Sequence, residues 1–182
     1  MIAGRVLPVV ALSVLLAAAQ DFSRSKQAWI SFHAPGAVEI HRGSSSTVEL
    51  GFRIASGLHI NSHQPRQEYL KKTELNLDPP TDIVIERVHY PDGEDQSFPF
   101  APDEKLSVYS GDFAITVLVR PLKTILPAKY AIHGVLKYQA CDKAVCYPPK
   151  QLPLSFEVQI LKNPAGEKRR NPAQSPHTHP SG

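Results

Sequence analysis

The sequence predicts an all-β protein, an immunoglobulin-like antiparallel β-sandwich. Three observations support this fold class. Apolar and polar residues alternate along several short segments, no segment beyond the N-terminus has the apolar stripe of an amphipathic helix, and 17 prolines are too many for a helical bundle. Clusters of Gly, Pro, Asp and Ser separate the alternating segments, as turns separate the strands of an antiparallel sheet.

Six alternating or β-branched segments are the expected strands. They cover residues 47–54, 73–77, 82–90, 112–119, 130–138 and 152–160. The first shows the pattern most clearly, because Val48, Leu50, Phe52 and Ile54 fall on one face of a strand. Antibody domains have a Cys…Trp…Cys order, which is absent here because Trp29 precedes both cysteines.

The first 19 residues have the pattern of a secretory signal peptide. Arg5 supplies the positive charge, residues 7–16 are apolar, and residues 17–19 are all alanine. We expect cleavage after Ala19, with an uncleaved N-terminal anchor as the alternative. No second apolar run approaches spanning length, so the mature chain is not expected to span a membrane. An exported location, where disulfides can form, is therefore expected.

The remaining length of about 160 residues suits one folded domain. We place this domain at residues 20–160 and a disordered basic tail at residues 161–182. The formal net charge is +3, but Arg5 and the tail carry the positive excess, so the domain itself is close to neutral. A neutral domain has no electrostatic footprint for nucleic acid, and no nucleic-acid partner is expected.

The two cysteines lie in the segment "YQACDKAVCYPP" at residues 138–149. Four residues separate Cys141 from Cys146, which suits a hairpin loop that places them opposite each other on neighbouring strands. Opposed residues of an antiparallel pair have Cα atoms roughly 4.5–5.5 Å apart, within the roughly 4.4–6.8 Å usual for disulfides. The pair is therefore expected to close.

Three interpretations of the pair stay open. A bridge that closes about six residues stabilises a fold by roughly 2 kcal/mol, against about 4.7 kcal/mol for about 100 residues, so a redox pair is favoured over a structural bridge. Zinc would need two more ligands at the usual spacing, which the sequence lacks. Copper bound by the cysteines with His59 or His63 is a further alternative. We expect neither a metal nor a cofactor.

Four segments resemble, in order, the N-terminal periplasmic domain family of the thiol:disulfide interchange protein DsbD. They are residues 56–77, 88–93, 106–119 and 134–158, of which residues 138–149 are the specific part. The resemblance extends over roughly residues 29–160 and implies a periplasmic location. It implies an immunoglobulin-like fold. It also implies that the cysteines accept electrons from a membrane-embedded partner through a thioredoxin-like domain. They would pass them to periplasmic oxidoreductases and thioether-pathway proteins.

By this resemblance, Cys141 and Cys146 carry thiol–disulfide exchange, as a component of a protein-disulfide reductase. The C-terminal cysteine forms the mixed disulfides in that family, which implies that Cys146 attacks and Cys141 resolves. Because the sandwich and a short tail fill the chain, we expect partners in trans. The donor would be a thioredoxin-like or membrane protein, and the acceptor a periplasmic oxidoreductase or a cytochrome-maturation-type protein. The alternative function is a non-catalytic protein-binding module with a structural disulfide.

The family also shields its cysteines with a loop that bears an aromatic cap. Residues 94–105 are the expected mobile loop, with Phe98 and Phe100 as caps; the alternative is that both rings plug the end of the sandwich. Acidic residues near the cap in the family correspond to Asp95, Asp103 and Glu104.

Two further positions depart from the family. His59 and Asn61 stand where the family has tyrosines beside the cysteines, and we interpret them as proton-transfer neighbours or, alternatively, as structural residues. Between the cysteines, Lys143 would favour a thiolate and Asp142 would oppose it.

Overall fold

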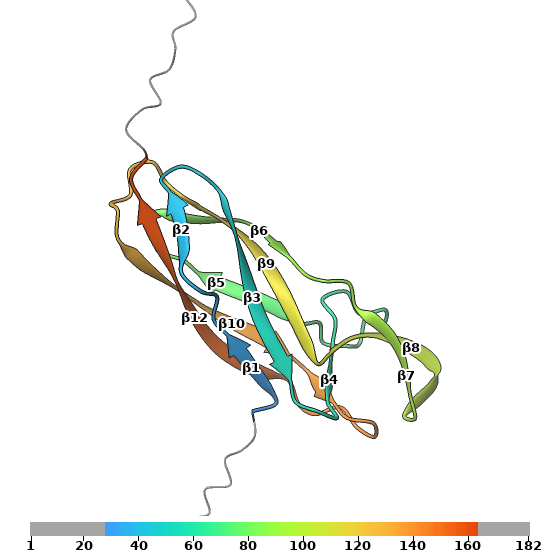
Figure 1. Ribbon diagram of the computed structural model, residues 1–182. Coiled ribbons are helices and arrows are strands. Elements are labelled where there is room, and N and C mark those ends of the chain that lie inside the picture. The colour runs from blue at the N-terminus through green and yellow to red at the C-terminus, as the bar shows by residue number, and fades with distance from the viewer. Residues whose placement is uncertain (1–27, 164–182) are drawn as a thin grey trace, which may run out of the picture.

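The computed structural model describes residues 28–163, and they form an all-β sandwich (Figure 1). Its first sheet contains, in spatial order, β1 (Ile30–His33), β3 (Ser46–Ile54), β9 (Asp112–Pro121) and β6 (Ile83–His89). Its second contains β2 (Val38–His41), β12 (Lys150–Leu161), β10 (Lys129–Tyr138) and β5 (Glu74–Asp78). The predicted immunoglobulin-like fold class is confirmed. One pairing departs from the antiparallel expectation, because β2 runs parallel to β12.

A third, smaller sheet lies at one end of the sandwich (Figure 1). It contains β11 (Ala140–Cys141), β4 (His59–Asn61), β8 (Ala101–Ser110) and β7 (Glu94–Phe98). The turn at Gly111, whose φ of 63° suits glycine, links β8 to β9 of the first sheet. The second sheet is also connected directly to the small sheet, since β11 follows β10 after one residue.

Alternating side chains from the two large sheets form the core. Val48, Leu50, Phe52 and Ile54 of β3 are all buried, as their spacing predicts. The neighbouring strand β9 contributes Ile115, Val117 and Val119, and β12 of the second sheet contributes Leu154, Phe156, Val158 and Ile160. Each fully buried side chain of this size stabilises the fold by roughly 1.5–3 kcal/mol before entropy is counted.

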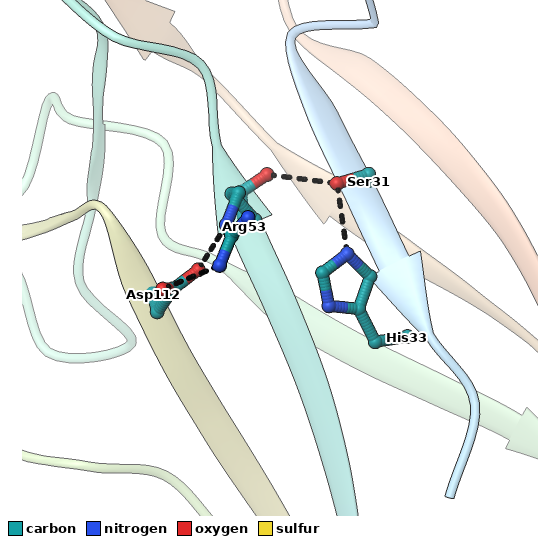
Figure 2. A network of polar contacts seen from close by, with 4 residues as sticks. All are labelled: Ser31, His33, Arg53 and Asp112. Atoms are coloured by element: carbon teal, nitrogen blue, oxygen red, sulfur yellow. Dashed lines mark hydrogen bonds and ion pairs between the residues drawn. The ribbon is translucent and has the colours of Figure 1, made fainter.

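The outward face of the first sheet is polar. Arg53 of β3 and Asp112 of β9 are register partners, and Arg53 donates from Nε to Asp112 Oδ1 at 2.6 Å. Ser31 on β1 donates to the Arg53 carbonyl at 3.5 Å and lies 3.4 Å from His33 Nε2 (Figure 2). Both charged side chains are more than half exposed, so solvent screens the pair. This face therefore looks like ordinary solvated surface.

The expected loop at residues 94–105 is a β-hairpin. These residues form β7 and the first half of β8, which pair antiparallel, and their mobility remains a prediction. Gln96 pairs with Leu106 and Glu94 with Val108, and both apolar partners are buried. The ladder and this burial order a segment whose prolines and acids are typical of loops.

No helix among residues 28–163 is long and apolar enough to cross a membrane. The predicted signal peptide and most of the predicted tail lie outside the described residues, and the predicted domain boundaries remain predictions.

Candidate redox site

The cysteine hairpin lies at the end of the sandwich that carries the small sheet (Figure 1). Cys141 and Cys146 form an isolated antiparallel bridge, their Cα atoms are 4.0 Å apart, and a disulfide joins them. The expectation that the pair closes is confirmed. Outside the bridge, β10 and β12 pair without interruption from Lys129 opposite Gln159 to Tyr138 opposite Lys150. The disulfide thus closes only a local loop, at the end of a β10–β12 ladder whose strands already pair with each other.

The two cysteines differ in exposure. Cys141 is 0% exposed, because β11 places it in the small sheet beside β4. Cys146 is exposed and follows Val145, which is itself 51% exposed. An incoming sulfur must approach a disulfide in line with the bond that breaks, so an attack needs access to the sulfur. Cys146 is accordingly the accessible member of the pair and Cys141 the enclosed one.

Asp142 holds the loop between the cysteines. Its Oδ1 accepts hydrogen bonds from the backbone amides of Ala144 at 2.7 Å and Val145 at 2.8 Å. Its Oδ2 accepts a hydrogen bond from the Tyr147 hydroxyl at 2.5 Å. The Tyr147 hydrogen bond first, and then the two amides, lower the pKa of Asp142 below its ordinary value of 3.8. The same hydrogen bond raises the pKa of Tyr147. The loop therefore has its own polar frame besides the disulfide.

A second set of hydrogen bonds ties the hairpin to β4. Asn61 is fully buried, and its Nδ2 donates to the Lys71 carbonyl at 2.9 Å and to Gln139 Oε1 at 3.4 Å. Gln139 Nε2 in turn donates to the Tyr147 carbonyl at 3.1 Å. This chain connects Asn61 to the strand that leaves the loop. The structure thus brings Asn61 to the site as a support for the hairpin, and its predicted part in proton transfer remains untested.

Loss of Asp142 is expected to loosen the loop. An Asp142→Ala variant loses both acceptor oxygens and with them all three hydrogen bonds, so the amides of Ala144 and Val145 should exchange with solvent faster. Asp142→Asn keeps Oδ1 as an acceptor and should retain most of the protection. Hydrogen exchange followed by NMR measures both variants, and equal protection in wild type and Asp142→Ala would contradict the assignment.

The lowered pKa of Asp142 also sets a pH dependence. The folded protein favours the carboxylate, so this support is present above pH 3.8 and is lost as the pH falls through the lower, folded value. The NMR signals of the Ala144 and Val145 amides should therefore titrate only in that acid range, and should not titrate in Asp142→Asn. Titration of wild type well above pH 3.8 would contradict this sign.

His59 lies next to the buried cysteine. It is the antiparallel register partner of Cys141, and partners in such a ladder direct their side chains to the same face. His59 is 4% exposed, and burial lowers its pKa below the ordinary 6.5, while the nearby Asp142 carboxylate acts against that shift. It is therefore neutral at neutral pH.

The aromatic pair predicted as a cap lies over His59. The Phe98 ring stacks on the His59 ring with centroids 3.9 Å apart, and Phe100 stacks on Phe98 at 5.5 Å. Phe98 is 8% exposed and packs with Leu106 and Val108, whereas Phe100 is 38% exposed. The structure thus places Phe98 near the cysteines, in contact with His59. Phe98 is buried like a plug of the sandwich end, and it also covers the residue beside Cys141 as a cap would. Whether the rings act as a cap remains a prediction.

The acidic residues of the same hairpin have other partners. Asp95 forms an ion pair with Arg66, and Glu104 accepts a hydrogen bond from the Tyr69 hydroxyl at 2.9 Å. Asp103 and Lys143 are exposed. The contacts of these residues do not connect them to the cysteines.

The residues named in the metal alternatives have other contacts in the structure. Both cysteines are in the disulfide, and among residues 28–163 no three His, Cys, Asp or Glu side chains are grouped to hold a metal ion. His63 hydrogen-bonds through Nδ1 to the Thr73 carbonyl at 2.9 Å and stacks on Tyr90. It is therefore engaged by its own neighbours.

Sequence reasoning missed several residues that build the site. Gln139 and Tyr147 anchor the hairpin, and Trp29 packs against Tyr147 with ring centroids 4.7 Å apart. Lys150 Nζ lies 3.2 Å from the centroid of the Trp29 ring. One signal was available, because Asp at the start of a tight turn commonly caps the amides two and three residues on. The other contacts are tertiary and leave no local pattern.

A family model and several solved structures are similar to this chain. The family model of the N-terminal part of the thiol:disulfide interchange protein DsbD matches residues 26–156, well over half of the chain. No curated protein sequence matches. Similar solved structures include the DsbD N-terminal domain of Neisseria meningitidis in the reduced form, with 21% identity, 76% of this chain and 92% of that chain covered, and a TM-score of 0.42.

Another is the N-terminal periplasmic domain of ScsB from Proteus mirabilis, with 15% identity, 69% of this chain and 44% of that chain covered, and a TM-score of 0.46. The seventh ScaB type I cohesin of Pseudobacteroides cellulosolvens has 11% identity, coverage of 85% and 99%, and a TM-score of 0.44. The family-model match and the closed Cys141–Cys146 disulfide support thiol–disulfide exchange in general. This chain belongs to the family of the N-terminal domain of the thiol:disulfide interchange protein DsbD.

Proposed function

We propose that this chain is an exported, periplasmic domain that relays reducing equivalents through Cys141 and Cys146. The donor is a thioredoxin-like or membrane protein, and the acceptor is a periplasmic oxidoreductase or a cytochrome-maturation-type protein. One observation carries the proposal: a closed disulfide at the end of the sandwich has one exposed and one fully buried cysteine. That asymmetry suits a pair in which partners meet one sulfur only.

The chemistry balances as two exchanges. A donor thiolate attacks Cys146, the Cys141–Cys146 bond breaks, and the resulting mixed disulfide is resolved by the donor's second thiol, which leaves both cysteines reduced. The Cys146 thiolate then attacks the acceptor's disulfide, and its first sulfur leaves as a thiolate. Cys141 loses its proton and attacks Cys146, which releases the reduced acceptor and restores the disulfide. Two electrons pass from donor to acceptor in each cycle.

The disulfide is expected to be reducible by a thioredoxin-like protein without loss of the fold. It closes a loop of about six residues, and the β10–β12 ladder that precedes it is complete without it. Mass spectrometry should find one intramolecular disulfide before reduction and two free thiols after it. Circular dichroism should retain the β signal throughout.

The reduction potential separates this function from that of a protein-binding module with an inert bridge. Redox titration against glutathione or a thioredoxin couple is expected to give a value above about −300 mV, the range in which such couples can cycle a disulfide. A value well below this, or loss of the β signal on reduction, would make the bridge structural and would remove the relay.

A further inference from the structure

We propose that His59 accepts the proton of Cys141 when this thiol resolves a mixed disulfide on Cys146. The inference rests on the proposed relay and assigns one of its steps. Resolution needs the Cys141 thiolate, yet Cys141 is fully buried, and burial in apolar surroundings disfavours a thiolate. A base beside the buried thiol would remove that obstacle. The register places His59, and no other imidazole, opposite Cys141 in the β4–β11 ladder.

An unsatisfied atom supports this role. His59 Nε2 is buried and, within residues 28–163, has no hydrogen-bond partner. Buried polar atoms without partners are rare in folded proteins and call for an explanation. In the oxidised form the sulfur of Cys141 carries no proton to donate. After reduction Cys141 is a thiol, whose S–H supplies a donor on the same face of the ladder.

The surroundings of His59 keep it available as a base. Phe98 of β7 covers one face of the ring, and the backbone partner on β8 is Ser110, which carries no charge. Ser110 Oγ lies 3.4 Å from Gln96 Nε2, and Gln96 also donates to Glu94 at the edge of the sheet. From β11 and its loop come Cys141 and the Asp142 carboxylate, whose charge would stabilise a protonated imidazole.

The step is balanced in atoms and electrons. Neutral His59 takes the proton from Cys141 Sγ, and the thiolate attacks Cys146 of the mixed disulfide. The Cys141–Cys146 bond forms as the bond between Cys146 and the partner sulfur breaks, and the electron pair leaves with that sulfur. The proton on His59 then passes to the leaving thiolate or to water. No further oxidant or reductant takes part.

The test separates the two exchange steps with Ellman's reagent. The reduced, mature wild-type protein should release one thionitrobenzoate when Cys146 attacks and a second when Cys141 resolves. A His59→Phe variant keeps an aromatic ring against Phe98 but has no base, so its second release should slow by about 10²-fold, the low end of general-base effects. The first release should be unchanged. His33→Phe, at an exposed histidine of β1, is the matched control and should behave as wild type.

The pH profile of the second release distinguishes a base from a packing role. With His59 as the acceptor, the wild-type rate should rise to a plateau around or below pH 6.5 and stay flat until the thiol itself ionises. Without a base, as in His59→Phe or His59→Gln, it should rise about tenfold per pH unit up to the thiol pKa, ordinarily about 8.5. His59→Gln provides a second variant if the Phe form does not fold.

Equal second-step rates and profiles in wild type and a folded His59 variant would overturn this assignment. So would equal slowing of both steps. The relay fails by a different result, namely absence of exchange between the wild-type disulfide and a thioredoxin-like protein.

Discussion

A Cys141→Ser variant is expected to accumulate as a stable mixed disulfide with its redox partner, whereas Cys146→Ser should trap very little. The reason is the unequal exposure of the two cysteines. Cys146 is exposed and can meet a partner's sulfur, but without Cys141 no thiol remains to resolve the product. In the reverse variant the remaining thiol, Cys141, is fully buried in the small sheet.

Non-reducing electrophoresis after incubation with a thioredoxin-like protein measures the trapped fraction. The partner should carry a single reactive cysteine, activated as its mixed disulfide with thionitrobenzoate, so that the thiol of this domain displaces thionitrobenzoate and the partner has no second thiol to resolve the complex. The Cys141→Ser/Cys146→Ser double variant is the control and should trap nothing. Equal trapping by the two single variants would contradict the assigned order, and trapping by neither would contradict exchange.

The second large effect is expected at Phe98. This ring stacks on His59, the register partner of Cys141, and packs with Leu106 and Val108, so Phe98→Ala is expected to uncover the Cys141 side and to leave a cavity. We expect faster alkylation of reduced Cys141 and a loss of roughly 3 kcal/mol in the free energy of unfolding, the low end for a buried Phe. For a domain of this size such a loss lowers the melting temperature by roughly 6–12 °C.

Phe100 provides the comparison within the cap. Its ring is 38% exposed and contacts Phe98, so Phe100→Ala should speed Cys141 alkylation less and change the melting temperature little. The alkylation rate of Cys146, measured on the same peptide map, is the internal reference and should not change. Leu126→Ala, at an exposed residue on another loop, is the control for both readouts. An unchanged alkylation rate of Cys141 in a folded Phe98→Ala/Phe100→Ala variant would contradict the prediction that these rings act as a cap.

Local patterns were enough to predict six of the eight strands of the large sheets, whereas the four-residue strands β1 and β2 were missed. Strict alternation in β3, β9 and β12 reflects one buried and one solvated face, and the burial of Phe52 and Phe156 confirms it. The short strand β4 was missed because His59, Ile60 and Asn61 are all buried, which leaves no alternation to detect. The β7–β8 hairpin was missed because its prolines and acidic residues are typical of loops, although its two strands pair with each other.

The features of the site also divide into those that local sequence predicts and those that depend on tertiary contacts. Closure of Cys141 with Cys146 was predictable because a four-residue loop determines the geometry locally. The unequal exposure of the two cysteines was not, because it arises from β11 docking on β4, a contact between segments far apart in sequence. The stacking of Phe98 on His59 has the same origin.

The single accessible sulfur determines the order in which partners can bind in the proposed relay. Donor and acceptor must dock at the same end of the sandwich, because Cys141 is fully buried and cannot be attacked from elsewhere. The two therefore compete, and the domain must release one before it can meet the other. Its cycle is a double displacement in which the domain alternates between a reduced form with two thiols and an oxidised form with the disulfide. Because the bridge closes only a local loop, the two forms are expected to have nearly the same outline. Partners would then have to tell them apart by the chemistry of one sulfur atom, and throughput would depend on how quickly each complex dissociates.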